Sequence, residues 1–574
     1  MMSYETDYQL WLSQENLDAD LKSQLLAMSE QEKEDAFYRN LEFGTAGMRG
    51  IIGVGTNRMN IYTIRKANAG FAQFLLENVE NAKERGVVIA YDSRHFSPEF
   101  AMESAKVLAT NGIKAYVFES LRPTPELSFA VRYLKAAGGI VVTASHNPPE
   151  YNGYKIYDET GCQSVPAEAE KVVALVDSVE NVFDIQVKPE SELKAAGLIE
   201  IIGEEVDNAY NERVKSLEIN KEMNKKDLKI VFSPLHGTAN EPVSRLLKEC
   251  GYEQLHIVKE QAIPDPDFTT VKSPNPEDPA AFEMSIALGK EIDADILIAT
   301  DPDADRVGLM VKDPNGEYTI LTGNQTGAIL LHYILSQKKE QGTLPAKGRV
   351  FNTIVTSEMG AAIAKAYGYE VVSTLTGFKF IGEQARLMEG TDYEYIFGYE
   401  ESYGYLIGDF VRDKDSVQSV LMCAEAAAYY KSLGKTLYEV LVELYETYGF
   451  YREGLVNITL KGKEGADKIN LILSEFRAVA PKNIGGFDVV KVEDYKESTC
   501  TDLVNESTKD IELPKSNVLK YHLSDGSWFV LRPSGTEPKA KVYIAVISDM
   551  MEKADAQVSK IKEDVLARVN EIIA

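Results

Sequence analysis

Three aspartates at alternate positions form the first group in this sequence that could do chemistry. In an extended segment, Asp301, Asp303 and Asp305 would point to one side. Carboxylates crowded in this way repel one another unless a cation lies among them, and hard oxygen ligands suit Mg²⁺. A calcium EF-hand is excluded, because its glycine and terminal glutamate would fall at Arg306 and Lys312. An acidic surface turn is the alternative, but the apolar run 296–299 before the trio and Arg306 after it favour a metal site.

A serine supplies the second candidate group. The apolar run 139–142 predicts a buried strand that delivers Ser145 to a loop at its carboxyl end, where open α/β sheets bind ligands. A hydrolase elbow would need glycine where Thr143 and Asn147 stand. Next to a magnesium site, a serine favours phosphoryl transfer, and the missing Walker loop weakens a nucleotide-dependent kinase. His146 and Lys155 are general acid/base candidates close to Ser145 in sequence.

Polar loops elsewhere could bind a phosphorylated sugar. Residues 43–50 form a glycine-rich loop in which Arg49 is the only charge, and residues 151–155 read as a turn leading to a lysine. Glu400 and Ser402 follow an apolar run and could bind sugar hydroxyls, although a solvated glutamate is the plainer interpretation. The run 531–539 offers a guanidinium, hydroxyls and an exposed backbone N–H to a phosphate, through Arg532, Ser534, Gly535 and Thr536.

The elements that position these loops alternate between strand and helix, which predicts an α/β protein with mostly parallel sheets. We expect three similar α/β domains with mixed, mostly parallel sheets and a smaller C-terminal α+β domain. The expected limits are 1–215 with a helical leader, 216–325, 326–450 and 451–574. The Ser145 loop, the aspartate trio and the Glu400 loop fall one to each of the first three domains, and Arg532 falls in the fourth.

Composition restricts the function further. The chain has 574 residues and a formal net charge of −28, which argues against nucleic-acid binding. Its cysteines, at 162, 250, 423 and 500, show no paired spacing and fit reduced thiols. No leader pattern and no apolar run near the roughly 20 residues of a membrane span is present. We therefore expect a cytoplasmic protein that binds neither membrane nor nucleic acid, as a monomer or weak homo-oligomer.

Taken together, the four loops resemble those of the α-D-phosphohexomutase superfamily. The resemblance runs from about Phe43 to Tyr543, with the motifs 143–148, 301–306, 398–402 and 532–536 in the family's order. It implies four domains around a central cleft and a resting enzyme phosphorylated on Ser145. It also implies Mg²⁺ held by Ser145, Asp301, Asp303 and Asp305, and transfer through glucose 1,6-bisphosphate, which is also an activator.

The same resemblance assigns roles to the remaining residues. It places Arg49, Arg306, His146 and Lys155 around the transferring group. It implies that Glu400 and Ser402 read sugar hydroxyls and that the fourth domain holds the non-reacting phosphate. The expected substrate-binding residues are Thr376, Gly377, Lys379, Glu400, Ser402, Arg532, Ser534, Gly535 and Thr536.

Specificity within the superfamily stays open. Members that act on both glucose and mannose often have Gly-His after the sugar-loop serine, whereas Tyr403-Gly404 follows Ser402 here. This chain is therefore more similar to the phosphoglucomutase and phosphopentomutase branches, and interconversion of glucose 1-phosphate and glucose 6-phosphate is the expected reaction. Phosphomannomutase and phosphopentomutase activities are the alternatives, with Lys155, His146 or Lys379 as the acid/base. A hydrolase and a non-catalytic sugar-phosphate sensor are the further hypotheses.

Overall fold

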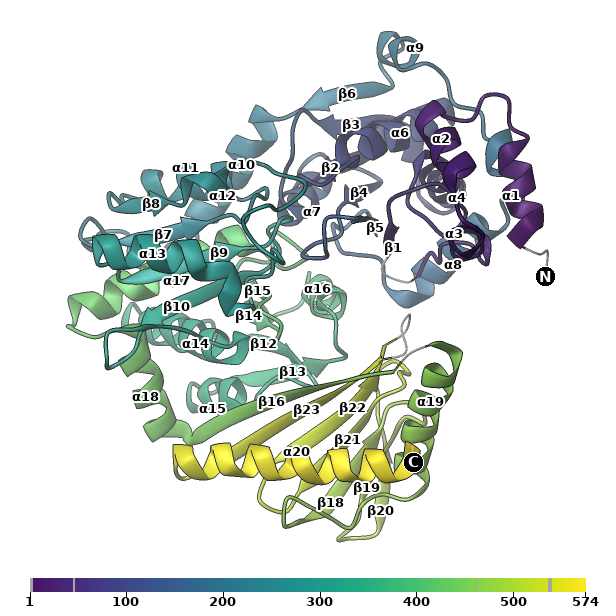
Figure 1. Ribbon diagram of the computed structural model, residues 1–574. Coiled ribbons are helices and arrows are strands. Elements are labelled where there is room, and N and C mark those ends of the chain that lie inside the picture. The colour runs from purple at the N-terminus through teal and green to yellow at the C-terminus, as the bar shows by residue number, and fades with distance from the viewer. Residues whose placement is uncertain (1–3, 45–46, 461, 535–538, 574) are drawn as a thin grey trace. The chain divides into compact units, whose positions relative to one another are not determined.

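The computed structural model describes residues 4–44, 47–460, 462–534 and 539–573. The chain divides into two compact units, which Figure 1 shows as ribbons. The first contains residues 1–326, 337–348 and 378–437, and the second contains residues 327–336, 349–377 and 438–574. None of the helices in the described ranges combines the length and apolar character needed to cross a bilayer.

The first sheet of unit 1 has six strands in the order β1-β5-β4-β2-β3-β6. Strands β2, β3, β4 and β6 run parallel, because helices connect them, and β1 and β5 complete one edge in antiparallel pairing. Helices α6 and α7 pack on the inner strands. The strands are β1 (Met48–Ile51), β2 (Val87–Tyr91), β3 (Ala115–Phe118), β4 (Gly138–Val142), β5 (Tyr151–Tyr157) and β6 (Ile199–Ile202), and the helices are α4 (Ile61–Asn78), α6 (Ser97–Thr110), α7 (Thr124–Tyr133) and α8 (Pro166–Asp177).

The predicted helical leader is confirmed as three short helices. Trp11, Phe37 and Tyr62 bury their rings in one apolar cluster, and this anchors the leader to helix α4. Ser29 and Glu32 form a capping box that fixes the start of the third helix. The leader helices are α1 (Tyr4–Leu12), α2 (Ala19–Ala27) and α3 (Glu30–Phe37).

The second sheet has the order β11-β10-β9-β7-β8. Strands β7, β8 and β9 are parallel, whereas β10 returns antiparallel to β9 through a short turn that contains the aspartate trio. The strands are β7 (Ile230–Ser233), β8 (Leu255–Ile257), β9 (Ile296–Thr300), β10 (Val307–Lys312) and β11 (Tyr318–Ile320), and the helices are α10 (Glu204–Lys215), α11 (Asn240–Glu249) and α13 (Glu283–Ile292).

A third α/β segment contributes to both units. In unit 1, β14 (Glu394–Tyr399) pairs antiparallel with β15 (Tyr405–Leu406), beside α16 (Phe378–Leu387) and α17 (Ser416–Ser432). In unit 2, β12 (Gly348–Thr353) pairs parallel with β13 (Glu370–Thr374) and is followed by α15 (Met359–Ala366). The long helix α14 (Gly323–Glu340) starts at a capping box made by Thr322 and Gln325.

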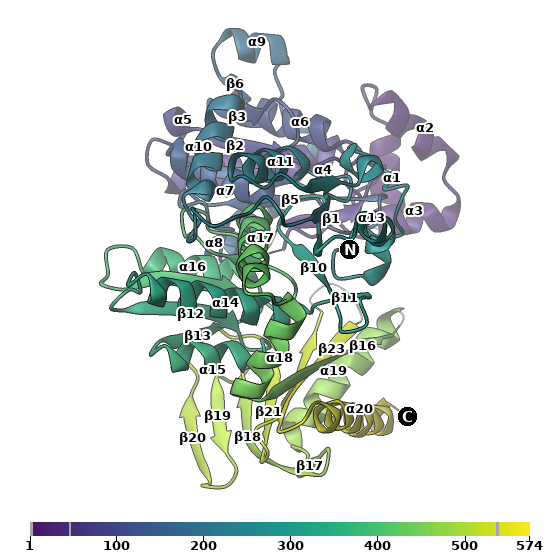
Figure 2. The same cartoon turned by 90° about the vertical axis from the view of Figure 1, so that its left-hand side faces the viewer.

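The C-terminal stretch forms an antiparallel sheet in unit 2, in the order β16-β23-β22-β21-β18-β19-β20. Helix α20 lies along β16 and β23, and the hairpin β19–β20 extends at the other edge (Figure 2). The elements are α18 (Leu437–Tyr448), β16 (Phe450–Thr459), α19 (Gly462–Ala478), β17 (Asn483–Ile484), β18 (Phe487–Asp494), β19 (Thr499–Asp502), β20 (Ser507–Asp510), β21 (Leu519–Leu523), β22 (Trp528–Pro533), β23 (Lys539–Ser548) and α20 (Met551–Ile573).

The predicted fold class is confirmed, with two local corrections. Mixed sheets with parallel strands are followed by an α+β C-terminal region, as expected. The prediction of a turn at residues 151–155 was wrong, because these residues form part of strand β5. Tyr154 and Ile156 of this strand pack in the hydrophobic core. Polar loops were expected to bind the substrate, but Lys379, one of the expected substrate-binding residues, lies in the first turn of helix α16.

Candidate active site

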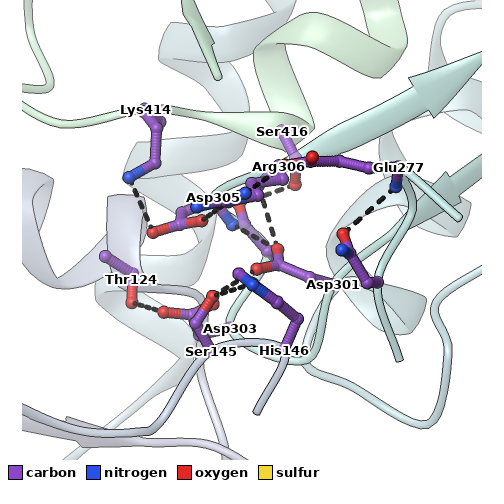
Figure 3. Close-up of polar contacts among 12 residues, drawn as sticks. Thr124, Ser145, His146, Glu277, Asp301, Asp303, Asp305, Arg306, Lys414 and Ser416 are labelled. Carbon is purple, nitrogen blue, oxygen red and sulfur yellow. Dashed lines mark hydrogen bonds and ion pairs between the residues drawn. The ribbon is translucent and has the colours of Figure 1, made fainter. Parts of the chain in front are cut away.

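Ser145 lies directly after the fully buried strand β4, as predicted. Its backbone adopts the left-handed conformation, with φ of 52°, and its N–H donates to Thr143 Oγ1 at 2.8 Å. The side chain is only 4% exposed, and its hydroxyl donates to Asp301 Oδ2 at 2.7 Å (Figure 3). His146 Nδ1 lies 3.1 Å from the same Oγ. A sharp, hydrogen-bonded loop therefore fixes this hydroxyl in one place.

Arg94 stabilises the Ser145 loop through hydrogen bonds to its backbone. It is 1% exposed and donates to the backbone carbonyls of Pro148 at 2.8 Å and Tyr151 at 3.0 Å, and also to those of Ser145 and Asn147. Asp92 lies 3.3 Å from Arg94 Nε and neutralises the buried charge. Arg94 was not among the predicted site residues. Its position directly after β2, next to β4 in the sheet, is the signal that could have identified it.

The aspartate trio is brought together by the turn between β9 and β10. One ligand oxygen from each of Asp301, Asp303 and Asp305 lies within 4.8 Å of the others, and all three side chains are buried. The prediction of an extended segment was wrong. Ala304 is left-handed, with φ of 56°, and the N–H groups of Asp305 and Arg306 fold back onto Asp301 Oδ1.

The electrostatics of the trio fit a divalent cation. Burial, together with repulsion from Asp305 and Asp303, raises the pKa of Asp301 well above its usual range. Within the described ranges, Asp303 Oδ1 and Asp305 Oδ1 are buried without a hydrogen-bond donor. Three hard oxygens with acceptor capacity to spare are the donor set that Mg²⁺ prefers. A cation among them would remove the repulsion.

Two lysines and an arginine neutralise part of this charge. Lys155 Nζ lies 2.8 Å from Asp303 Oδ2, and Lys414 Nζ lies 3.0 Å from Asp305 Oδ2. Although burial opposes it, these lysines lower the pKa of Asp305. Arg306 pairs with Glu277 beside the trio. Lys414 was not among the predicted site residues. It lies in a loop immediately before helix α17, and its charged neighbours in sequence are typical of a solvated loop.

His146 and Arg49 also contact the Ser145 loop. Burial, together with the positive charges of Arg306 and Arg49, lowers the pKa of His146 well below its usual value, so the imidazole is neutral. Arg49 comes from β1, and its Nη1 donates to Asn147 Oδ1 at 2.9 Å. The structure therefore brings together the predicted residues Ser145, His146, Lys155, Arg49, Arg306, Asp301, Asp303 and Asp305.

The Glu400 loop contacts this group through the β9–β10 hairpin, whose turn carries the aspartate trio. Glu400 is 4% exposed and contributes negative charge near Arg306 and Lys414. Tyr403 accepts the N–H of Val307, the first residue of β10, at 3.0 Å. A Cβ at Gly404 would lie 2.1 Å from Cδ of Lys414, so a larger residue there would displace the Lys414 side chain. Ser402, half-buried, lies in the same turn.

The remaining predicted substrate-binding residues differ from Glu400 and Ser402 in their contacts or in the unit to which they belong. Lys379 is in unit 1, but its Nζ lies over the ring of Phe380 at 5.4 Å, and its carbonyl accepts from Cys162 Sγ at 3.5 Å. Thr376, Gly377, Arg532 and Ser534 belong to unit 2.

Within unit 2, Arg532 lies in β22 and not in a loop. Its Nη1 donates to Tyr543 Oη at 3.4 Å, and the N–H of Ser534 donates to Lys539 O at 2.8 Å. Gly535 and Thr536 lie outside the described residues.

Comparisons with known proteins cover nearly the whole chain. Four family models match in order: "Phosphoglucomutase/phosphomannomutase, alpha/beta/alpha domain I" at residues 40–183, domain II at 208–316, domain III at 322–448 and the C-terminal domain at 455–566. The chain is 40% identical to a phosphoglucomutase of Staphylococcus epidermidis over 519 residues, which cover 90% of this chain and 93% of that protein. It is 39% identical to a phosphoglucomutase of Staphylococcus aureus over 557 residues, covering 96% and 98%.

A solved structure supports the fold. A phosphoglucomutase/phosphomannomutase family protein from Burkholderia thailandensis superimposes with a TM-score of 0.66 at 20% identity, covering 92% of this chain and 97% of that one. The order of the four matched regions is the order in which the Ser145 loop, the aspartate turn, the Glu400 loop and Arg532 occur. The chain belongs to the phosphoglucomutase/phosphomannomutase family, within the α-D-phosphohexomutase superfamily.

Proposed function

We propose that this protein is a phosphoglucomutase, an isomerase that interconverts glucose 1-phosphate and glucose 6-phosphate. The observation that carries the proposal is the hydrogen bond from Ser145 Oγ to Asp301 Oδ2, which joins a buried hydroxyl to a cluster of carboxylates that could hold a metal ion. Family membership and relatives that bear the name phosphoglucomutase at 39–40% identity support this assignment.

In this proposal Ser145 is the phosphoryl carrier. A sugar hydroxyl oxygen attacks the phosphorus of phosphorylated Ser145, the new P–O bond forms, and the bond from phosphorus to Ser145 Oγ breaks. The sugar hydroxyl gives up its proton to a base, and Oγ recovers a proton when the hydroxyl is restored. The product is glucose 1,6-bisphosphate. The bisphosphate then reverses its orientation within the site. Its other phosphoryl group is transferred to Ser145, and the second monophosphate is released.

Asp301, Asp303, Asp305 and Ser145 would hold Mg²⁺, which when bound supplies positive charge to the phosphoryl oxygens. Lys155 and the neutral His146 are the candidates for holding the proton, since each lies within the cluster around Ser145. Arg49 and Arg306 would neutralise the negative charge on the equatorial oxygens of the phosphoryl group that is transferred, because guanidinium groups pair well with phosphate.

We assign substrate binding to the remaining loops. Glu400 and Ser402 would accept and donate hydrogen bonds to sugar hydroxyls common to both orientations. The non-reacting phosphate would be held by the fourth domain, since a guanidinium binds phosphate in any orientation of the sugar. The full proposed set is Glu400, Ser402, Thr376, Gly377, Lys379, Arg532, Ser534, Gly535 and Thr536.

The decisive experiment combines mass measurement with a coupled assay. We expect purified protein to carry one phosphoryl group, mapped by peptide analysis to Ser145, and to convert glucose 1-phosphate in the presence of Mg²⁺ and glucose 1,6-bisphosphate. Ser145→Ala should carry no phosphoryl group, and its kcat should fall at least a thousandfold. Ser178→Ala, at an exposed helix end, should keep the phosphoryl group and the kcat of the parent.

The same assay separates this function from its alternatives. Glucose, mannose and ribose phosphates are compared at equal concentration. A strong preference for mannose or pentose would replace glucose by that sugar within the same mechanism. A serine never modified during turnover would overturn the carrier role.

A further inference from the structure

A cavity of about 540 Å³ lies within unit 1, away from Ser145, among helices α7, α10 and α11. Its wall is apolar at Leu121, Pro242 and Val417 and polar at Glu126 and Thr238. This volume is within the range of small-molecule sites, and the mixture of an apolar wall with a few buried polar groups is typical of them. Neither the family assignment nor the proposed reaction uses it.

The walls of this cavity hold the reverse side of the aspartate turn. The N–H of Thr238 donates to Pro302 O at 2.8 Å. The N–H of Thr124, two residues before Glu126, donates to Asp303 O at 2.9 Å. Ser416, adjacent to Val417, donates its hydroxyl to Ala304 O at 2.6 Å. A molecule that fills the cavity would therefore press on the segments that position the metal loop.

The unsatisfied polar atoms on the wall are oxygens. Among the described residues that line the cavity, the buried side-chain atoms without a hydrogen-bond partner are Glu126 Oε1, Thr238 Oγ1 and Asn240 Oδ1. Glu126 and Thr238 are 2% and 3% exposed. A carboxyl oxygen and an amide oxygen accept hydrogen bonds, and a hydroxyl can do so. A ligand that donates hydrogen bonds could satisfy these oxygens.

The charges on the wall favour a cation over the anions that bind at Ser145. Arg122 is paired with Asp207, with its Nε and Nη2 each at 2.8 Å from a carboxylate oxygen. Arg245 donates from Nε to Glu249 at 2.9 Å. Glu126 shares a hydrogen bond with Asp207 and also interacts with Arg122, whose guanidinium is already paired with the Asp207 carboxylate. Burial and the neighbouring Asp207 raise the pKa of Glu126 well above the usual range, so an incoming cation would ionise it.

We propose that this cavity is an effector site for a small molecule that carries a primary ammonium group, which donates to Glu126, and that its occupation alters the metal loop. An ammonium donates N–H groups, and the cavity wall offers it the Glu126 carboxyl together with the unsatisfied oxygens Thr238 Oγ1 and Asn240 Oδ1. Glu126 gives up its proton to solvent as the ammonium binds.

Calorimetric titration of the full-length protein tests the binding, with ethanolamine and putrescine as probes and with ethylene glycol and 1,4-butanediol as their hydroxyl counterparts. We expect a submillimolar dissociation constant for at least one amine and no detectable binding of either diol. The measured enthalpy should differ between PIPES and HEPES, because a proton is released to the buffer. Glu126→Gln should weaken binding at least tenfold and abolish the buffer dependence.

Two further variants test the cavity independently of Glu126 and control for the loss of a carboxylate. Ala262→Leu narrows the cavity from its wall and should weaken binding while leaving Glu126 intact. Glu168→Gln, the same change at a half-buried glutamate elsewhere in unit 1, should bind as the parent does. Equal binding of amine and diol, equal affinity in Glu126→Gln, or no binding of either amine would overturn the site.

The coupling to the metal loop has its own measurement. The Mg²⁺ concentration for half-maximal turnover should shift at least twofold when a binding amine is saturating, and should not shift in Glu126→Gln. An amine that binds without moving this midpoint would overturn the effector role and leave the binding site. Because binding is followed by heat, its outcome does not depend on which sugar phosphate the enzyme converts.

Discussion

Ser145 Oγ donates to Asp301 Oδ2 at 2.7 Å, although the two residues are 156 positions apart in the chain. Ser145 comes from the first sheet and Asp301 from the second, and both lie at the carboxyl ends of their strands. Each side chain is almost completely buried. This contact joins a hydroxyl that can carry a phosphoryl group to a carboxylate that can bind a metal.

The first prediction concerns the metal. Asp303→Asn keeps the size of the side chain and its contact with Thr124 but removes a charged ligand. We expect kcat to fall at least a hundredfold and half-maximal activity to need more Mg²⁺, because a neutral amide oxygen binds Mg²⁺ less well. Removal of Mg²⁺ by EDTA should abolish turnover, and added Mg²⁺ should restore it. Full activity of Asp303→Asn would contradict the metal assignment.

A second prediction concerns Arg94 as a positioning residue. Arg94→Lys keeps the charge near Asp92, but a single ammonium cannot serve the spread of carbonyls that the guanidinium reaches. We expect the variant to lose about 2–3 kcal/mol of unfolding free energy. Its kcat should fall more than its KM rises, because the Ser145 loop shifts.

Arg58→Lys provides the control for Arg94→Lys. Arg58 also donates to backbone carbonyls, those of Asp35 and Asn57, and within the described residues it forms no hydrogen bond with the Ser145 loop. Its kcat should match that of the parent. A stable Arg94→Lys enzyme with unchanged kcat would show that the loop holds its shape without the guanidinium.

The third prediction concerns Lys414. Lys414→Met keeps the stem that packs over Gly404 but removes the ammonium 3.0 Å from Asp305. We expect kcat to fall about a hundredfold, the size typical of a lost proton-transfer or charge-stabilising group. Lys431→Met, at an exposed ion pair with Asp295, should leave kcat unchanged. Equal kcat in Lys414→Met and the parent would remove Lys414 from the site.

The fourth prediction concerns pH. Asp415 caps helix α17 and accepts the Tyr210 hydroxyl, and burial raises its pKa from 3.8 to about 6. The folded state therefore holds this proton more tightly than the unfolded state. The resulting stability is complete below about pH 4 and is lost as pH rises to about 6, by about 3 kcal/mol in all.

Asp415→Asn removes this dependence while keeping a good helix cap. Relative to the parent, its unfolding free energy in urea should rise by up to about 3 kcal/mol between pH 4 and pH 7. Asp278→Asn, at a partly exposed cap, should show no comparable change. Parallel pH curves for Asp415→Asn and the parent would contradict the assignment.

The sequence alone predicted the α/β class, the loops that follow buried strands, and the identity of the groups around Ser145. Hydrophobic runs and their spacing are local properties, so β4 and β9 could be predicted together with the polar residues that end them. Tyr151–Tyr157 was missed, because Asn152 and Gly153 suggest a turn until the core shows that the segment is a strand.

Only the tertiary structure decided which distant residues meet. The aspartates converge because Ala304 turns the chain in a left-handed conformation, not because an extended segment aligns them. Lys414 and Arg94 became visible as functional candidates through contacts across more than 50 positions, to Asp305 and to the Ser145 loop. Local sequence determines strands, helices and the chemistry of each side chain. Distances between segments are set by how sheets and helices pack, and a single sequence does not contain them in any local pattern.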